Sequence, residues 1–119
     1  MKKISAAILD FAVPLTENLA PDAPLDLRRE TLGIAITVWN ALVMQACGQD
    51  EYLTELFDRF RNMPPRTSAA MAPLVQALLL RRHSLYADDL RLVGKWELND
   101  LGNGELSLRA EAHAPPGKK

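Results

Sequence analysis

The side chains best suited to chemistry gather between positions 80 and 90 of the chain. A histidine is followed there by two aspartates, and imidazole and carboxylate groups together can bind a metal ion or transfer protons. An arginine and a tyrosine nearby add a cation and a hydroxyl. The group that could form a small-ligand or catalytic site consists of Arg82, His83, Tyr86, Asp88 and Asp89.

The number of potential metal ligands is small. The chain has two histidines, His83 and His113, and one cysteine, Cys47. Neither histidine has a second histidine or a cysteine at ligand spacing, and Asp88 and Asp89 are more typical of the turn that follows a helix. We therefore expect no metal ion and no other cofactor.

Nucleophilic and phosphate-binding motifs are missing from the sequence. No serine has the flanking glycines of a nucleophile elbow, and Cys47 lies in an apolar stripe that does not lower the pKa of a thiol. The segment Asn99–Gly104 precedes a predicted strand rather than a helix, so it indicates a turn and not a phosphate loop. We assign no catalytic residue and expect a protein that is not an enzyme.

Arg82 lies on the apolar side of its predicted helix and must find a partner or extend to solvent. The favoured interpretation is an ion pair with Asp88 or Asp89, or hydrogen bonds to the last carbonyls of the helix. The alternative is an anion or nucleic-acid site on one basic surface, formed by Arg81, Arg82, Arg91, Lys95 and Arg109. Glutamates interleave with these residues on the predicted strands, which is typical of a solvated face.

Apolar residues at helical spacing predict the elements that position these groups. The four predicted helices span residues 4–19, 27–47, 51–62 and 67–85. Pro14 predicts a kink in the first helix, Asp26 and Asp50 are suitable N-caps, and Gly48 suits a left-handed residue after the second helix. Pro73 is close enough to the start of the fourth helix to be tolerated.

The predicted helix over residues 27–47 carries two apolar stripes, separated by a narrow polar or small strip that includes Gly33, Thr37 and Asn40. A helix that is apolar around most of its circumference is either central in a domain or lends one stripe to a partner. The candidate interface combines the second stripe with a tryptophan of the C-terminal region, and consists of Ile36, Trp39, Val43 and Trp96.

Residues 90–112 change to a period of two and predict an antiparallel β-hairpin. Leu92, Gly94 and Trp96 are expected on the apolar face, and Val93 and Lys95 on the opposite face. A two-stranded hairpin needs a surface to pack on, and its edges keep free backbone groups that a second copy or an extended segment could pair with. We expect residues 113–119 to form a flexible tail.

Composition excludes several classes of protein. A hydrophobic fraction of 48% with 24% charged residues is typical of a globular domain, and a net charge of −1 gives no general attraction to polyanions. Asp10 interrupts the apolar N-terminal run, so this run predicts a helix rather than a signal peptide, and no segment predicts a membrane span. A single cysteine favours a reducing, cytoplasmic location.

The hairpin residues Gly104–Glu111, after a helical body, resemble small uncharacterised bacterial proteins of the same layout. The resemblance covers mainly the last third of the chain and implies no activity or site.

The sequence predicts a mostly α (α+β) fold: one domain over residues 1–112, with four helices and a C-terminal antiparallel hairpin. The predicted function is a non-enzymatic interaction or accessory protein that self-associates as a homodimer. A small nucleic-acid-associated regulator, and a small-ligand binder or enzyme around Arg82, His83, Tyr86 and Asp88, are the alternatives.

Overall fold

The computed structural model describes residues 2–102 and 105–115 of the chain. Within them, helices are followed by a two-stranded antiparallel sheet, which confirms the predicted α+β, mostly α, fold class. In chain order the elements are α1 (Ile4–Phe11), α2 (Val13–Thr16), α3 (Leu25–Ala46), α4 (Glu51–Arg61), α5 (Pro65–Leu85), β1 (Leu92–Gly102) and β2 (Glu105–His113).

The first predicted helix is divided in two at Ala12, so the described residues contain five helices and not four. Pro14 is the second residue of α2, a position where the missing N–H costs no helical hydrogen bond. The predicted kink is therefore a break between α1 and α2. The apolar stripe continues across the break, and Ile8, Phe11 and Leu15 are all buried.

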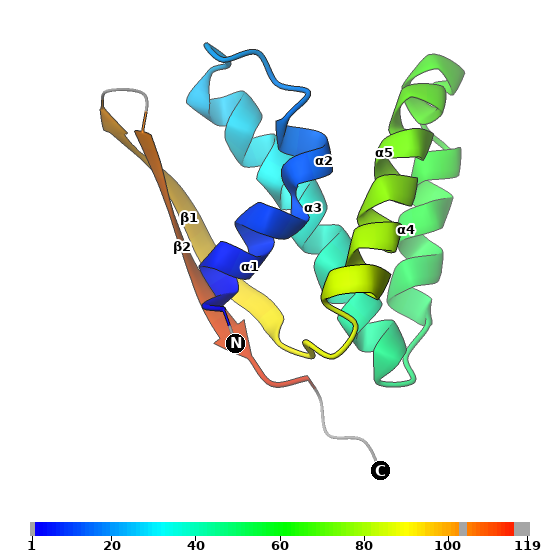
Figure 1. Cartoon of the computed structure of the whole chain (residues 1–119). Coiled ribbons are helices and arrows are strands. Elements are labelled where there is room, and N and C mark those ends of the chain that lie inside the picture. The colour runs from blue at the N-terminus through cyan, green and yellow to red at the C-terminus, as the bar shows by residue number, and fades with distance from the viewer. Residues whose placement is uncertain (1, 103–104, 116–119) are drawn as a thin grey trace.

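Helix α3 runs through the middle of the molecule, between the hairpin on one side and the pair α4 and α5 on the other (Figure 1). The expected N-cap is wrong, because α3 begins at Leu25 with Pro24 at its N-cap, and Asp26 lies inside the first turn. Gly48 follows the C-terminal end with a φ of 90°, as predicted. The second apolar stripe is wholly buried, whereas in the first stripe Val38 and Leu42 are buried and Leu27 is exposed.

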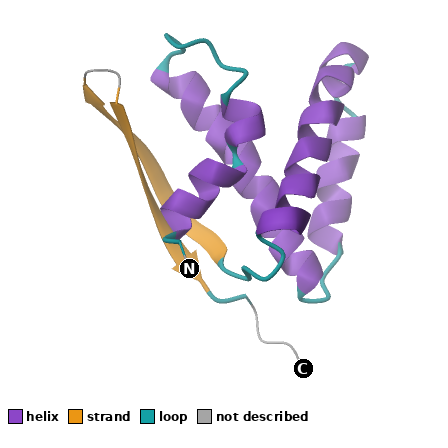
Figure 2. Ribbon diagram, in the orientation of Figure 1, coloured by secondary structure: helices purple, strands orange, loops and turns teal. Residues whose placement is uncertain are grey.

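Helices α4 and α5 form an antiparallel pair joined by a short loop (Figure 2). Asp50 occupies the N-cap position of α4 but its side chain makes no capping hydrogen bond. Helix α5 begins at Pro65, two residues before the predicted start, and Pro73 therefore lies in its interior rather than near its start.

The hairpin differs from the expected alternation because of a β-bulge between Val93 and Trp96. The bulge reverses the side-chain direction, so Val93 is buried with Leu98 instead of facing solvent. Gly94, within the bulge, lies against His113, and a β-carbon at position 94 would be 2.1 Å from the imidazole.

The bounds of the hairpin also differ from those predicted. Strand β1 continues to Gly102, so most of the predicted Asn99–Gly104 turn is strand, and residues 103 and 104 lie outside the described residues. His113 belongs to β2 and pairs with Leu92, so the predicted tail begins later. Residues 116–119 of that tail lie outside the described residues.

The buried Trp39 ring of α3 is the point where the layers meet. Its Nε1 donates a 2.7 Å hydrogen bond to the carbonyl of Arg91, just before β1. Phe11 and Tyr86 contact the ring edge-to-face, with centroid distances of 5.2 Å and 5.4 Å. One side chain thereby joins α1, α3, the end of α5 and the start of the hairpin.

We expect the substitution Trp39→Phe to lower the free energy of unfolding by about 2–4 kcal/mol, because it leaves a cavity and an unpaired carbonyl at Arg91. Urea denaturation measures this change. Trp96→Phe is the matched control: its side chain is half-buried and makes no hydrogen bond to the described residues, so its loss is smaller. Equal losses for the two variants contradict the assignment of Trp39 as the central contact.

Candidate functional site

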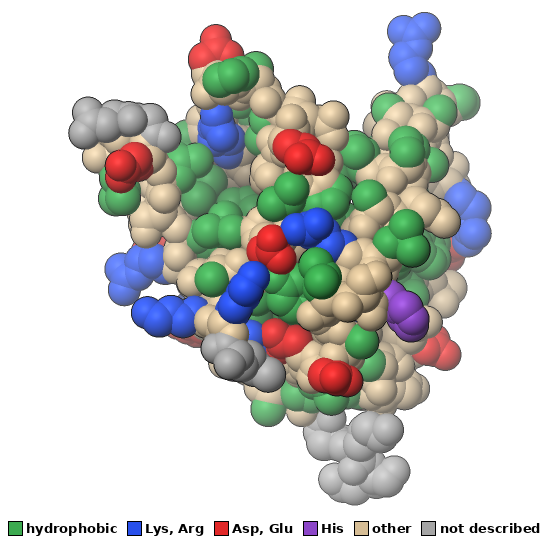
Figure 3. All heavy atoms as spheres, in the orientation of Figure 1, with side chains coloured by type: hydrophobic (Ala, Val, Ile, Leu, Met, Phe, Trp, Pro, Cys, Tyr) green, Lys and Arg blue, Asp and Glu red, His purple; other side chains and the backbone are tan. Residues whose placement is uncertain are grey.

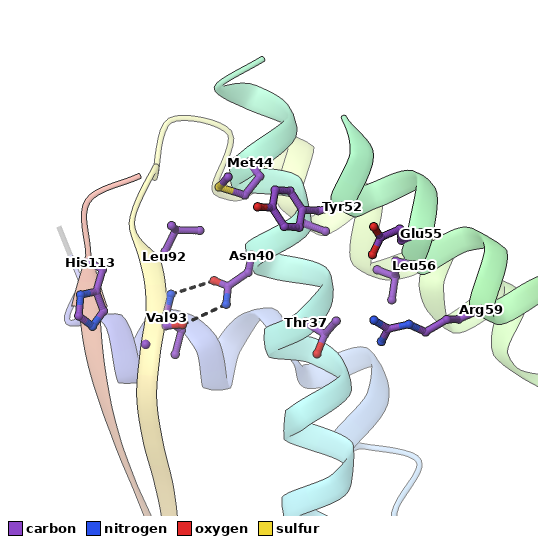
Figure 4. Close-up of a pocket in the computed structure, with 12 residues that line it drawn as sticks. Thr37, Asn40, Met44, Tyr52, Glu55, Leu56, Arg59, Leu92, Val93 and His113 are labelled. Carbon is purple, nitrogen blue, oxygen red and sulfur yellow. Dashed lines mark hydrogen bonds between the residues drawn. The ribbon is translucent and has the colours of Figure 1, made fainter. Parts of the chain in front are cut away.

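Side chains of α3 occupy the outer edge of β1. The Asn40 amide binds both backbone groups of Val93: Nδ2 donates to the Val93 carbonyl at 3.0 Å, and the Val93 N–H donates to Oδ1 at 2.8 Å (Figure 4). Further along, Arg29 Nη2 donates to the Leu98 carbonyl at 3.2 Å. These bonds take the place of a third strand beside β1, so this edge of the hairpin is partly occupied.

The same contacts determine which backbone groups of β2 face outward. Val93 pairs with Ala112, and Leu98 pairs with Leu108. The backbone groups of Val93 and Leu98 bind side chains of α3, so both are non-hydrogen-bonded pairs, in which each residue directs its N–H and C=O groups away from the partner strand. The N–H and C=O groups of Leu108, Ala110 and Ala112 therefore point away from β1. Within residues 2–102 and 105–115, no hydrogen bond to these outward groups is found. The outer edge of β2 is therefore the edge of the hairpin without hydrogen-bond partners among the described residues, which we call the open edge, although α1 also packs against this strand.

The side chains of β2 divide between two faces. Leu106, Leu108 and Ala110 lie toward the helices and are buried or half-buried. Arg109 and Glu111 lie on the opposite face and are exposed, two residues apart and opposite in charge. The open edge thus has an apolar side and a charged side.

The predicted interface residues do not form a surface. Ile36, Trp39 and Val43 are buried in the core of the chain itself, because α1, α5 and the hairpin cover the second stripe of α3. Trp96 is half-buried, and a β-carbon at Gly33 of α3 would lie 3.6 Å from its ring. Three of the four candidate interface residues therefore belong to the core of the chain and not to an exposed surface.

The predicted polar cluster is only partly brought together. His83, Tyr86, Asp88 and Asp89 line one cavity of about 570 Å³, and Arg82 is not part of its lining. His83 and Asp88 are exposed, while Tyr86 and Asp89 are buried.

Arg82 does not form the expected ion pair, because Arg91 binds both carboxylate oxygens of Asp89, at 2.9 Å and 2.6 Å. Arg82 is only 5% exposed, and its guanidinium carbon lies 4.8 Å from the centroid of the Trp39 ring. Neither of its terminal nitrogens has a hydrogen-bond acceptor among the described residues. Burial lowers the pKa of Arg82, opposed by the charge of Asp89.

Asp10 is the residue that sequence reasoning missed. Its carboxylate accepts a hydrogen bond from the Tyr86 hydroxyl and one of 2.8 Å from Arg81, and lies 3.7 Å from Lys2. The Tyr86 bond is the main cause of a lowered pKa of Asp10, and desolvation is the main cause of a raised pKa of Tyr86. Asp10 is thus held ionised and Tyr86 protonated, which suits a structural contact between α1 and α5. The only signal in the sequence was an aspartate interrupting an apolar run.

The predicted basic surface is divided among several contacts. Arg81 binds Asp10, Arg91 binds Asp89, and Arg82 is buried. Arg109 lies 3.7 Å from Glu97 across the hairpin. The face in Figure 3 shows basic and acidic side chains interspersed.

Comparisons with known proteins provide no relative. No protein-family model matches the chain, and searches of curated proteins and of solved structures find no significant similarity. Among the described residues, no three potential ligands are grouped so that they could hold a metal ion, and no helix has the length and apolarity to cross a membrane.

We expect Asp10→Asn to lower the free energy of unfolding at pH 7 by about 1–2 kcal/mol, since the hydrogen bonds to a charged acceptor are weakened at a site partly screened by solvent. The folded-state pKa of Asp10 is lowered, so this stabilisation is present above its unfolded pKa and lost as pH falls through the folded value. The difference between the two proteins should therefore shrink steadily as the pH falls below the usual range of aspartate. Thermal denaturation from pH 7 to pH 2 measures it, with the exposed Asp22→Asn as control. A difference that persists unchanged at the lowest pH contradicts the assignment.

Arg82→Met should leave the free energy of unfolding unchanged or raise it by about 1–2 kcal/mol, because it removes a buried charge with unpaired nitrogens and keeps the packing on Trp39. The neighbouring Arg81→Met, which removes bonds to Asp10, should be destabilising. Urea denaturation of both variants tests this order. If Arg82→Met is the more destabilising of the two, the guanidinium has a bound acceptor in solution.

Proposed function

We propose that this protein is a non-enzymatic interaction or accessory protein that self-associates as a homodimer through the outer edge of β2. The observation that carries the proposal is the asymmetry of the hairpin. Side chains of α3 occupy the edge of β1, whereas the outward groups of Leu108, Ala110 and Ala112 have no partner in the described part of the chain. Pairing with another strand satisfies such groups.

The residues of β2 allow strand addition. Natural edge strands are commonly blocked by proline or by an inward lysine, and β2 contains neither. The strand is nine residues long, whereas the commonest strand length is about five or six and protected edge strands are often very short. A two-stranded sheet is also marginal alone, so a second hairpin would extend it to four strands.

The charge pattern selects one register for a symmetric dimer. Antiparallel pairing of two β2 edges with Ala110 on the two-fold axis places Leu108 opposite Ala112 of the second copy, so the outward groups pair with each other. In the same register Arg109 lies opposite Glu111 of the second copy, twice. Opposite charges in directly facing positions stabilise a pair of strands. Centring the axis on Arg109 instead would place two arginines face to face.

The alternative functions receive less support. A nucleic-acid regulator would need its arginines free, and Arg81, Arg82 and Arg91 are paired or buried. An enzyme around Arg82, His83, Tyr86 and Asp88 would need these groups to converge on one cavity, and Arg82 does not line the cavity that the other three share. A cytoplasmic location, favoured by the single cysteine, is part of the proposal.

We expect the protein to sediment as a dimer at high concentration and to dissociate on dilution. Ala110→Pro should yield a monomer, because it removes the N–H on the two-fold axis without removing a hydrogen bond between β1 and β2. Sedimentation velocity measures the mass, and circular dichroism verifies that the variant is folded. A wild-type chain that remains monomeric at about 1 mM contradicts self-association.

The proposed register is tested by reversing the charges of Arg109 and Glu111. Arg109→Glu should weaken the dimer about tenfold, because it places glutamate opposite Glu111 of the second copy. The double variant Arg109→Glu with Glu111→Arg should restore the dimer, since the facing pair is again opposite in charge. If the double variant does not regain the dimer affinity of the wild type, this register is ruled out. The Ala110→Pro variant then still tests whether the β2 edge forms the interface.

A further inference from the structure

A groove of about 510 Å³ lies between β1 and α4, with α3 as its floor (Figure 4). Its floor and walls are mainly apolar, formed by Ala41, Met44, Leu56, Leu92 and Val93. The volume lies within the range of sites that bind small molecules, and such sites combine an apolar lining with a few polar groups.

Some polar side chains of the groove already have hydrogen-bond partners within the chain, and others have none among the described residues. Asn40 uses its amide on Val93, and the Thr37 hydroxyl donates to the carbonyl of Gly33 at 2.8 Å. Asn40 and Thr37 are therefore committed to contacts within the chain. His113 belongs to β2 and lies on the far side of β1 from α4 (Figure 4).

Arg59 and Tyr52 of α4 are the donors that stay available. Within the described residues, neither side chain forms a hydrogen bond, and Arg59 forms no ion pair, although Glu55 precedes it by one helical turn. Figure 4 shows both side chains directed over the groove, with the tyrosine ring beside Met44 and the guanidinium towards Thr37. Tyr52 is 48% exposed, so much of its ring is accessible to a molecule in the groove.

We propose that this groove binds a small monocarboxylate with an aromatic or aliphatic body. The carboxylate accepts hydrogen bonds from the Arg59 guanidinium, whose planar geometry suits two carboxylate oxygens. The apolar body lies along Leu56 and Met44 and contacts the Tyr52 ring. This site is separate from the β2 edge, so it goes beyond the proposed self-association.

Glu55 limits the ligand to one carboxylate. It lines the same wall as Arg59 and forms no ion pair or hydrogen bond with the described residues. A second carboxylate on the ligand would meet this like charge, so a dicarboxylate of similar length is disfavoured. We expect the monocarboxylate to bind most tightly and the corresponding uncharged alcohol to bind more weakly. A dicarboxylate should bind no more tightly than the alcohol.

Phenylbutyrate is a suitable probe, and phenylbutanol is the same molecule without the charge. Titration of the full chain, followed by amide chemical shifts, should give saturable shifts in α3, α4 and β1 for phenylbutyrate, and binding of phenylbutanol at least about tenfold weaker. Arg59→Gln should weaken phenylbutyrate about tenfold and leave phenylbutanol unchanged. Arg61→Gln, on the same helix but paired with Asp58 and outside the groove, should change neither.

Two results overturn the proposal. If phenylbutyrate at concentrations up to about 10 mM gives no saturable chemical shift changes for amides of the groove, no such site exists. Equal affinities for acid and alcohol, or for the wild type and Arg59→Gln, show that the groove takes apolar molecules without recognising a carboxylate. Both results are independent of the oligomeric state, which sedimentation measures separately.

Discussion

The Trp39 side chain is the contact on which the arrangement of the layers depends. Its N–H binds the Arg91 carbonyl, its edges receive Phe11 and Tyr86, and the Arg82 guanidinium lies 4.8 Å from its centroid. These residues come from α1, from the C-terminal end of α5 and from the segment just before β1. A buried indole N–H requires an acceptor, so the start of the hairpin is held at one place on α3.

That attachment positions the polar strip of α3 against β1. Gly33 lies against Trp96, and Asn40 binds both backbone groups of Val93. The strip thus acts as a substitute for a neighbouring strand on one edge of the hairpin. Only one edge of the hairpin is bound in this way, since α3 contacts β1 and the outward groups of β2 have no hydrogen-bond partner within the described residues. The candidate surface for association follows from how the fold attaches its own hairpin.

Patterns local in sequence predicted much of this fold. The 3.6-residue spacing of the apolar stripes placed α3 within two residues at its start and one at its end, and the two-residue alternation located the hairpin. The bulge after Val93 could not be predicted, because it inserts one residue without changing the composition of the strand. The same holds for Asp10 and Arg81, which are 71 residues apart in sequence and meet only when α1 packs on α5. The pairing of Asp89 with Arg91 in place of Arg82 likewise depends on where the chain turns into β1. The site residues were therefore harder to predict than the elements, since they are defined by contacts between elements.

The central claim is that α3 occupies one edge of the hairpin and that a second copy of the chain occupies the other edge. Hydrogen exchange of individual amides tests this claim most directly when NMR measures it at a low and at a high protein concentration. The Val93 amide, bonded to Asn40, should be protected at both concentrations. The outward amides of Leu108 and Ala110 should exchange rapidly in the dilute sample and become protected in the concentrated one. Rapid exchange of these two amides at both concentrations, or rapid exchange of Val93, would contradict the account.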